Sequence, residues 1–260
     1  MARVPKLRNP RPIKPLIKNA RDYERDLRAA YVDPMMLRLR NRLAQAAAAD
    51  QAYRAMDDVV GQMTALPRDG VPEKLIQKHL NGMEGYHRDR VIKTFRSALA
   101  LDVSSVLKQE PIARFMRARV RENVDLIKTI PPRMHEGLKN KLQKELEKNP
   151  FDQARMMTLF NEEYKSTGYN LRRITRDQTS KTISGLTQVR HQQLGIDKYT
   201  WMTSADDRVR PSHRDNNGKE FLWADPPVAT GHPGHDIMCR CVAIPILNLS
   251  DRSRLRRMTE

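Results

Sequence analysis

The sequence predicts a mainly α-helical protein with a small α+β module near its C-terminal end and an extended, basic, proline-rich arm at its N-terminal end. Aromatic residues make up only 5% of the chain and charged residues 30%, and the prominence of Ala, Leu, Met, Arg, Lys and Gln favours helices. Four prolines fall within residues 1–20, where they oppose helix formation. After Gly195, short β-branched and aromatic runs between polar loops indicate strands.

Residues 1–20 form the predicted arm. The segment contains Pro5, Pro10, Pro12 and Pro15 and no acidic residue, a composition typical of an extended, polyproline-like strap. We expect it to contact DNA or a partner protein, with a disordered basic tail as the alternative. The basic residues that we expect to make the contact are Arg3, Lys6, Arg8, Arg11, Lys14 and Lys18.

Residues 21–168 are predicted to be a multi-helix body. A first helical stretch is broken at Pro34, with Asp33 placed to cap the helix that follows, and the run Ala44–Ala49 is expected to continue that helix. Later helices are expected over 87–108, from 112 to 130, over 133–148 and from Asp152 to Gly168. Prolines and glycines separate them: Pro67–Gly70, Pro111, Pro131-Pro132, Asn149-Pro150 and Gly168.

Residues 169–250 are predicted to be the C-terminal module, followed by a basic tail over 251–260. A long polar-rich helix over 171–194 ends at Gly195 and leads into a motif-rich cap. Three short strands are expected in this cap, near 196–203, 219–223 and 242–247. The tail adds Arg252, Arg254, Arg256 and Arg257.

The net charge of +17, with a pI of about 10.2, predicts an acidic partner such as nucleic acid, an anionic surface or an acidic protein. No apolar run approaches the length of a membrane span, and no apolar segment follows the basic start, so we expect neither a membrane anchor nor a signal peptide. The two cysteines, Cys239 and Cys241, are one residue apart and poorly placed for a disulfide, which favours a reducing compartment.

A charged loop lies between the first two predicted strands. Arg208 and Arg210 would share a face of an extended segment, where they could bind carboxylates or phosphates. The alternative is that they pair internally with Asp206, Asp207 or Asp236 and lock the loop.

A cluster of metal-ligating residue types follows. Structural zinc sites take four ligands from Cys and His, and a small module with few apolar residues gains folding energy from such a metal. We therefore predict a structural zinc site, with two buried free cysteines and hydrogen-bonded histidines as the alternative. The candidate ligands are His213, His235, Cys239 and Cys241, with His232 nearby.

Three function classes compete at this stage. Cys239 and Cys241 with neighbouring histidines would suit a metal- or thiol-dependent nuclease or hydrolase built on His213. However, the chain has no HExxH motif, no Gly-rich phosphate cradle and no nucleophile elbow, so we expect no catalysis. It also lacks the signatures of a sequence-specific nucleic-acid regulator. A structural protein with a basic surface remains the leading class.

The C-terminal segments resemble the phage Mu protein F-like head-morphogenesis family. The resemblance rests on RITRDQT (173–179), TWMTSADDRVRPSH (200–213), DPP (225–227), GHPG (231–234) and CRC (239–241), in this order and spacing. It covers residues 170–247. At the position of His235 the family is often acidic, so a three-ligand core of His213, Cys239 and Cys241 with a variable fourth ligand is the alternative to a site that uses His235.

The resemblance implies a minor head protein of a tailed phage and not an enzyme. Such a protein would lie inside the virion, after assembly in the host cytoplasm, in several copies. Its expected partners are the portal or the major capsid protein and packaged double-stranded DNA, which it would contact without sequence specificity.

Overall fold

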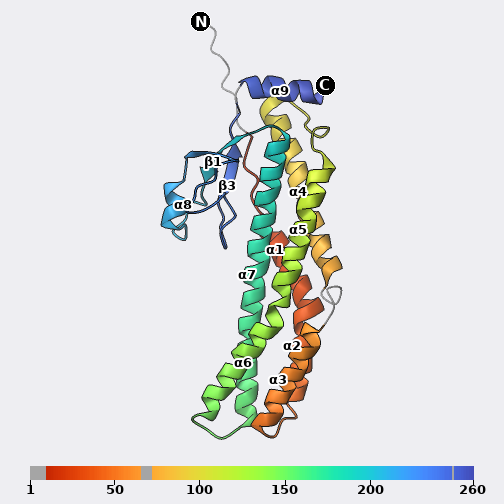
Figure 1. Ribbon diagram of the computed structural model, residues 1–260, viewed down its shortest axis with the longest axis vertical. Helices are drawn as coiled ribbons and strands as arrows, with labels where there is room; N and C mark the ends of the chain where they lie inside the picture. Colours follow the sequence, from red (N-terminus) through yellow and green to blue (C-terminus); the bar gives the residue numbers. More distant parts are fainter. Residues whose placement is uncertain (1–9, 66–71, 248) are drawn as a thin grey trace. The chain divides into compact units, whose positions relative to one another are not determined.

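The structure is a computed structural model that describes residues 10–65, 72–247 and 249–260. The described residues are mainly helical and carry one small antiparallel sheet near the C-terminal end, as the sequence predicts (Figure 1). They divide into two compact units. Among these residues, unit 1 contains 10–16, 80–119, 177–247 and 249–260, and unit 2 contains 17–65, 72–79 and 120–176. Each unit therefore draws on more than one of the predicted segments.

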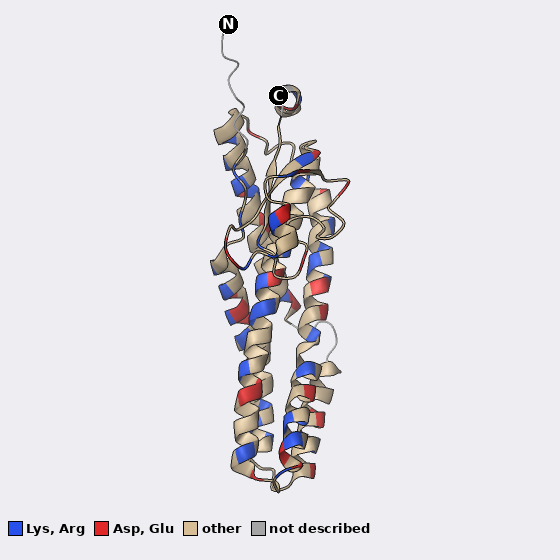
Figure 2. Cartoon of the chain, turned by 90° about the vertical axis from the view of Figure 1, so that its left-hand side faces the viewer, with Lys and Arg blue, Asp and Glu red and all other residues tan. Residues whose placement is uncertain are grey.

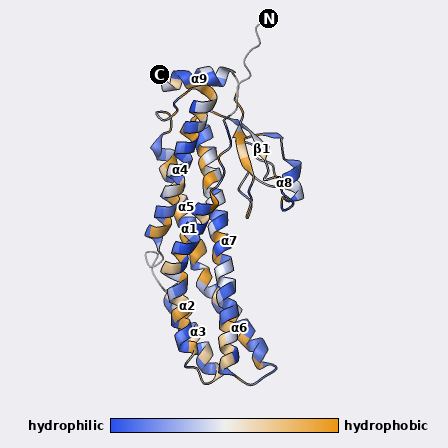
Figure 3. Cartoon of the chain, turned by 180° about the vertical axis from the view of Figure 1, so that it is seen from behind, coloured by the Kyte–Doolittle hydropathy of each residue, from blue (hydrophilic) through white to orange (hydrophobic). Residues whose placement is uncertain are grey.

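Unit 2 is built from helices alone. It contains α1 (Ile17–Leu27), the π-helical turn η1 (Arg28–Val32), α2 (Asp33–Leu43), α3 (Ala49–Thr64) and α6 (Ile130–Leu146), with parts of α4 (Glu73–Leu99), α5 (Gln109–Lys128) and α7 (Gln153–Gln193). The helices contain both apolar and polar residues (Figure 3), as expected of helices that bury one face. The buried faces supply the core, which includes Tyr23, Leu27, Leu39, Leu43, Met56, Leu138 and Leu171.

Unit 1 combines the remaining parts of α4, α5 and α7 with the sheet. Strand β1 (Lys198–Met202) lies between β2 (Glu220–Leu222) and β3 (Val242–Pro245), and both pairings are antiparallel. The short helix α8 (Pro211–Asp215) lies between β1 and β2, and α9 (Leu249–Thr259) ends the chain. All three strands lie within the predicted runs.

A small core gathers on one side of β1. Tyr199 and Trp201, two residues apart and therefore on the same side of the strand, are fully buried. Around them pack Trp223, Cys239, Cys241 and Ala243, with Phe221 partly buried beside them. The two cysteines are thus part of the packed interior of the sheet region.

Several predicted helix boundaries are wrong. Residues 44–48 form a turn between α2 and α3, although Ala44–Ala49 was expected to be helical. The side chain of Gln51 accepts a hydrogen bond from the Ala47 N–H (2.8 Å) and Ala46 is buried, so contacts at this turn prevail over the helix propensity of alanine.

Two expected breaks do not interrupt the helices. The chain stays helical through Pro34, where η1 precedes α2 and Asp33 makes no capping hydrogen bond; its carboxylate instead accepts one from Tyr164 (2.8 Å). Helix α7 runs through Gly168 as a single helix of 41 residues. A Cβ at Gly168 would lie 3.1 Å from Nη2 of Arg28, so this glycine permits a close approach instead of ending the helix.

Other differences concern shorter segments. Helix α4 begins at Glu73 and ends at Leu99, so residues 100–108, expected to be helical, lie outside it. Helix α1 begins at Ile17, two residues after Pro15, the last proline of the arm, so residues 17–20 are helical and not extended. The expected N-cap at Asp152 is confirmed, because its Oδ1 accepts the Arg155 N–H at 2.7 Å.

The described part of the arm, residues 10–16, has no regular secondary structure. Ile13 is buried, and the Lys14 carbonyl accepts a hydrogen bond from Tyr86 of α4 (3.2 Å). This portion is therefore attached to unit 1 instead of extending freely. Within the described residues, no helix combines the length and apolar character needed to cross a membrane.

Candidate metal centre near strand β3

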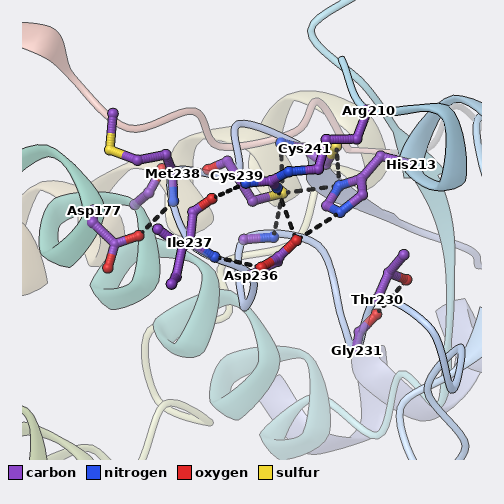
Figure 4. Close-up of polar contacts among 12 residues, drawn as sticks. Asp177, Arg210, His213, Thr230, Gly231, Asp236, Ile237, Met238, Cys239 and Cys241 are labelled. Carbon is purple, nitrogen blue, oxygen red and sulfur yellow. Dashed lines mark hydrogen bonds and ion pairs between the residues drawn. The ribbon is translucent and has the colours of Figure 1, made fainter. Parts of the chain in front are cut away.

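Three of the predicted ligands converge in unit 1. His213 lies on α8, and Cys239 and Cys241 precede β3. The His213 Nδ1 atom is 3.4 Å from Cys239 Sγ and 3.5 Å from Cys241 Sγ, and all three side chains are buried (Figure 4). The ligand atoms lie within 4.8 Å of one another. We call His213, Cys239 and Cys241 the thiol–imidazole cluster.

Local structure explains how His213 enters the cluster. Pro211 occupies the first turn of α8, where its missing N–H leaves no bond unmade. Arg210 before it is extended, and its carbonyl accepts the His213 N–H at 3.1 Å. The resulting single turn directs the imidazole toward the cysteines, with its ring 5.5 Å from the Trp201 ring in an edge-on contact.

Helix α7 positions the cysteine loop. Met238 has a positive φ of 56°, and its N–H donates to Asp177 Oδ1 at 2.7 Å. Ser180, one turn further along α7, donates its hydroxyl to the Cys239 carbonyl at 3.0 Å. These two contacts hold the backbone on either side of the Cys239 nitrogen, and neither α7 residue was identified from the sequence as part of the site.

Asp236 orients the imidazole. Its Oδ2 lies 3.2 Å from His213 Nε2, and the same oxygen accepts a hydrogen bond from Arg210 Nη1 at 2.8 Å (Figure 4). A carboxylate can only accept, so Nε2 of the neutral ring carries the proton and Nδ1 presents its lone pair to the two sulfurs. Arg210 also donates to the Ile237 carbonyl (2.6 Å), which fixes the orienting carboxylate in turn.

The two thiols differ in their electrostatics. A hydrogen bond from Cys241 and backbone N–H bonds from Cys241 (3.4 Å) and Gly234 (3.3 Å) lower the pKa of Cys239 to about 6. The pKa of Cys241 is raised because it donates to Cys239 and because it is buried. Cys239 is therefore prepared as a thiolate, the form that binds metal ions.

The charged loop is paired internally, which is the second of the two alternatives that the sequence left open. Arg240 donates to both oxygens of Asp206, one bond measuring 2.7 Å, and this hydrogen bonding lowers the pKa of Asp206. Arg208 is exposed and its guanidinium lies 4.0 Å from Asp206, while Asp207 is exposed. Arg210 is engaged by Asp236 as described above.

His235 is not brought into the cluster. Its ring packs edge-on against the His232 ring at 5.2 Å, and no fourth His, Cys, Asp or Glu ligand joins the group in the part of the chain that the structure describes. His232 instead shares a hydrogen bond with Tyr199 (2.9 Å), and burial lowers the pKa of His232 to about 4. The four-ligand arrangement predicted from sequence therefore reduces to its three-ligand alternative.

A cavity of about 200 Å³ adjoins the thiol–imidazole cluster. All three cluster residues line it, together with Ser204, Arg208, Val209, Arg210, Met238 and Arg240. The cluster is thus covered by protein on most sides and faces a small polar cavity on one.

The six basic residues expected to contact DNA or a partner divide into two groups. Arg3, Lys6 and Arg8 lie outside the described residues. Arg11, Lys14 and Lys18 are exposed, the first two in the irregular segment and the third on α1. Elsewhere in the described chain, Lys and Arg recur along the helices with Asp and Glu among them (Figure 2).

Comparison with known proteins identifies a family match in the C-terminal part of the chain. Residues 134–244 match the family described as phage Mu protein F-like protein, a range that includes the whole thiol–imidazole cluster. Over 200 residues the chain is 30% identical to an uncharacterized protein of Haemophilus influenzae. That alignment covers 76% of this chain but only 44% of the relative, so the chain spans less than half of that protein's length. No solved structure matches the chain.

Proposed function

We propose that the chain is a non-catalytic minor head protein that lies inside the capsid, because residues 134–244 match the phage Mu protein F-like family. The family match points to a phage head-morphogenesis protein, and this match is the observation that carries the proposal. The finer claims are association with the portal or the major capsid protein, several copies per virion, and non-specific contact with packaged double-stranded DNA.

The charge of the chain supports the contact with DNA. The net charge is +17, and Figure 2 displays basic residues along many helices instead of on one recognition element. Such a distribution suits binding to the phosphates of packaged DNA, because that binding needs positive charge and no recognition of the bases. The exposed Arg11, Lys14 and Lys18 add a concentrated group near the start of the described chain.

Location is tested in phage particles. Mass spectrometry of purified virions should detect the chain, and density from intact particles should place it on the inner side of the portal vertex. Particles that contain no copy of the chain, or density only on the outer surface, would overturn the proposed location.

DNA contact is tested by electrophoretic retardation of random duplex DNA over a salt series. The log of the affinity should fall with log salt by about 0.9 for each phosphate neutralised. Neutralising Arg11, Lys14 and Lys18 to Gln should lower this slope by up to about 2.7. A matched triple on α5, which neutralises the exposed Arg114, Arg117 and Arg121, makes the same change in net charge. A similar fall in slope for both triples is expected if the contact is spread over the helices, and a larger fall for the first triple would concentrate the contact at residues 11–18. No retardation at about 50 mM salt would refute DNA contact.

One observation favours a second candidate, a thiol- or metal-dependent nuclease or hydrolase. Cys239 Sγ is 3.4 Å from His213 Nδ1, and its pKa is lowered to about 6, as in an activated thiol. The burial of both cysteines opposes this alternative because a nucleophile must reach its substrate. Nuclease and hydrolase assays with added divalent metal, run beside a His213→Ala variant, distinguish the two: activity lost in the variant would replace the non-catalytic proposal.

A further inference from the structure

We propose that the thiol–imidazole cluster binds one zinc ion through His213 Nδ1, Cys239 Sγ and Cys241 Sγ, and that the fourth coordination position opens into the cavity beside Arg208. This inference does not depend on the proposed role in the phage head. It assigns the role of zinc ligand to these three buried atoms. It also separates the three ligating residues from the residues that only orient them.

The distances in the cluster match those of a zinc site. For tetrahedral zinc with Zn–S of about 2.3 Å and Zn–N of about 2.0–2.1 Å, the sulfur and nitrogen ligands are about 3.6 Å apart. The two Sγ–Nδ1 separations of 3.4 and 3.5 Å are close to this value. A neutral imidazole donor and two sulfurs are also the ligand types that zinc prefers.

The surroundings of the cluster are those of a metal ligand set. The contact between Asp236 and His213 Nε2 is the carboxylate–histidine arrangement that fixes the tautomer and orientation of a metal-binding imidazole. The Gly234 and Cys241 N–H groups both point at Cys239 Sγ, where they stabilise negative charge on the sulfur. His213 Nδ1 and Cys239 Sγ are therefore held with a lone pair available for a metal ion.

Charge balance explains why the cluster can be buried. Two thiolates in the packed core beside Trp201 would be costly without a compensating charge. A divalent cation with two thiolates and a neutral imidazole forms a neutral unit. Zinc would therefore compensate the charge of both thiolates and occupy the imidazole lone pair within the packed sheet region.

The fourth coordination position of the proposed zinc ion adjoins the cavity and takes no ligand from the described chain. Among the described residues no further His, Cys, Asp or Glu joins the three ligands, and all three line the same cavity of about 200 Å³. Arg208 and Arg210 also line this cavity. We infer that water or a small anion completes the coordination from the cavity.

Metal content provides the first test. Elemental analysis of the purified full chain should give about one zinc per molecule. Cys239→Ser, Cys241→Ser and His213→Ala should each lose the metal, whereas the matched control His235→Ala should retain it. Asp236→Asn should retain the stoichiometry and lower zinc affinity by about 10–100-fold, as expected of an orienting residue. Metal-free protein with two free thiols, or with a disulfide, would overturn the proposal, as would zinc loss in His235→Ala.

Cobalt substitution of the unmodified chain tests the coordination without relying on variants that could fail to fold. After removal of zinc by a chelator, Co²⁺ should restore one equivalent of binding, with thiolate-to-cobalt charge-transfer absorption and intense tetrahedral bands. Bound Co²⁺ should also quench the fluorescence of Trp201. Added azide should shift the visible bands if the fourth position is open. Unchanged bands would overturn the open position, and octahedral, thiolate-free spectra would overturn the ligand set.

Discussion

In unit 2, the buried residues repeat along helix faces, as with Leu39, Leu43 and Met56 on α2 and α3. In residues 196–247, here called the sheet segment, a small apolar core packs around Tyr199 and Trp201, and individual polar contacts hold the loops beside it. Unit 2 therefore distributes its stability over many interchangeable apolar contacts. The sheet segment concentrates it in a few residues that have specific partners, and we expect it to tolerate substitution poorly.

The two regions can be followed separately. Trp201 and Trp223 are the two tryptophans of the chain, and both belong to unit 1. Tryptophan fluorescence therefore reports on the sheet segment, whereas far-ultraviolet circular dichroism reports mainly on the helices. Differences between the two signals measure how far the regions behave differently.

Acid should give the largest loss of stability, and the loss should fall on unit 1. Burial holds the pKa of His87 well below its usual value, that of His191 at about 3 and that of His232 at about 4, and all three belong to unit 1. Each is neutral when folded, with an unfolded pKa of about 6.5, so the unfolded state binds more protons below that pH. The stability they contribute is present above about pH 6.5 and is lost as pH falls toward their folded pKa values.

The expected slope is up to about 1.4 kcal/mol per pH unit for each histidine. Urea unfolding followed by tryptophan fluorescence between about pH 7 and about pH 5 measures it. A chelator should be present throughout so that metal release does not contribute. His191→Gln should lower the slope of the free energy of unfolding against pH by the contribution of one histidine. A urea midpoint that does not change across this pH range would contradict the prediction.

Next in size is the effect of a methyl group at Gly234. This glycine has a φ of +83°, and a Cβ there would lie 2.0 Å from Ser184 Oγ, whose hydroxyl donates to the Pro233 carbonyl. Gly234→Ala should lower the free energy of unfolding by about 2–5 kcal/mol, through backbone strain and overlap together.

Gly218→Ala is the matched control for that variant. Gly218 has a similar φ of +81° with nothing within 4 Å of the added Cβ, so only the backbone strain of about 1–2 kcal/mol remains. Both variants are compared by urea unfolding. Equal losses would show that the contact with α7 adds nothing.

The smallest expected difference in stability is between variants of two aspartates that accept hydrogen bonds from backbone N–H groups. Asp177 is nearly buried, accepts from Met238 and pairs with Lys181 at 2.9 Å, so Asp177→Ala should cost about 1–3 kcal/mol. Asp152 caps α7 at an exposed position in unit 2, so Asp152→Ala should cost about 1 kcal/mol. A greater loss for Asp152 than for Asp177 in urea unfolding would contradict the contrast between the regions.

Sequence reasoning succeeded where a signal is local. The strands near 198–202, 220–222 and 242–245 follow from β-branched and aromatic runs, and the cap at Asp152 follows from residue type and position. It failed where packing and side-chain contacts decide: residues 44–48 are not helical despite the propensity of alanine, and Ala46 is buried there. Helix α7 continues through Gly168, where the glycine allows the close approach of Arg28.

The candidate site divides in the same way. The sequence by itself determined the mainly helical class, the basic charge and the cluster of candidate ligand types, because these depend on composition and spacing. Those candidates are His213, His235, Cys239 and Cys241. Only the tertiary structure decided that Asp236 orients His213, that His235 packs on His232, and that Asp177 and Ser180 hold the cysteine loop. Those outcomes depend on side-chain directions and on contacts between residues up to 61 positions apart, which no local pattern encodes.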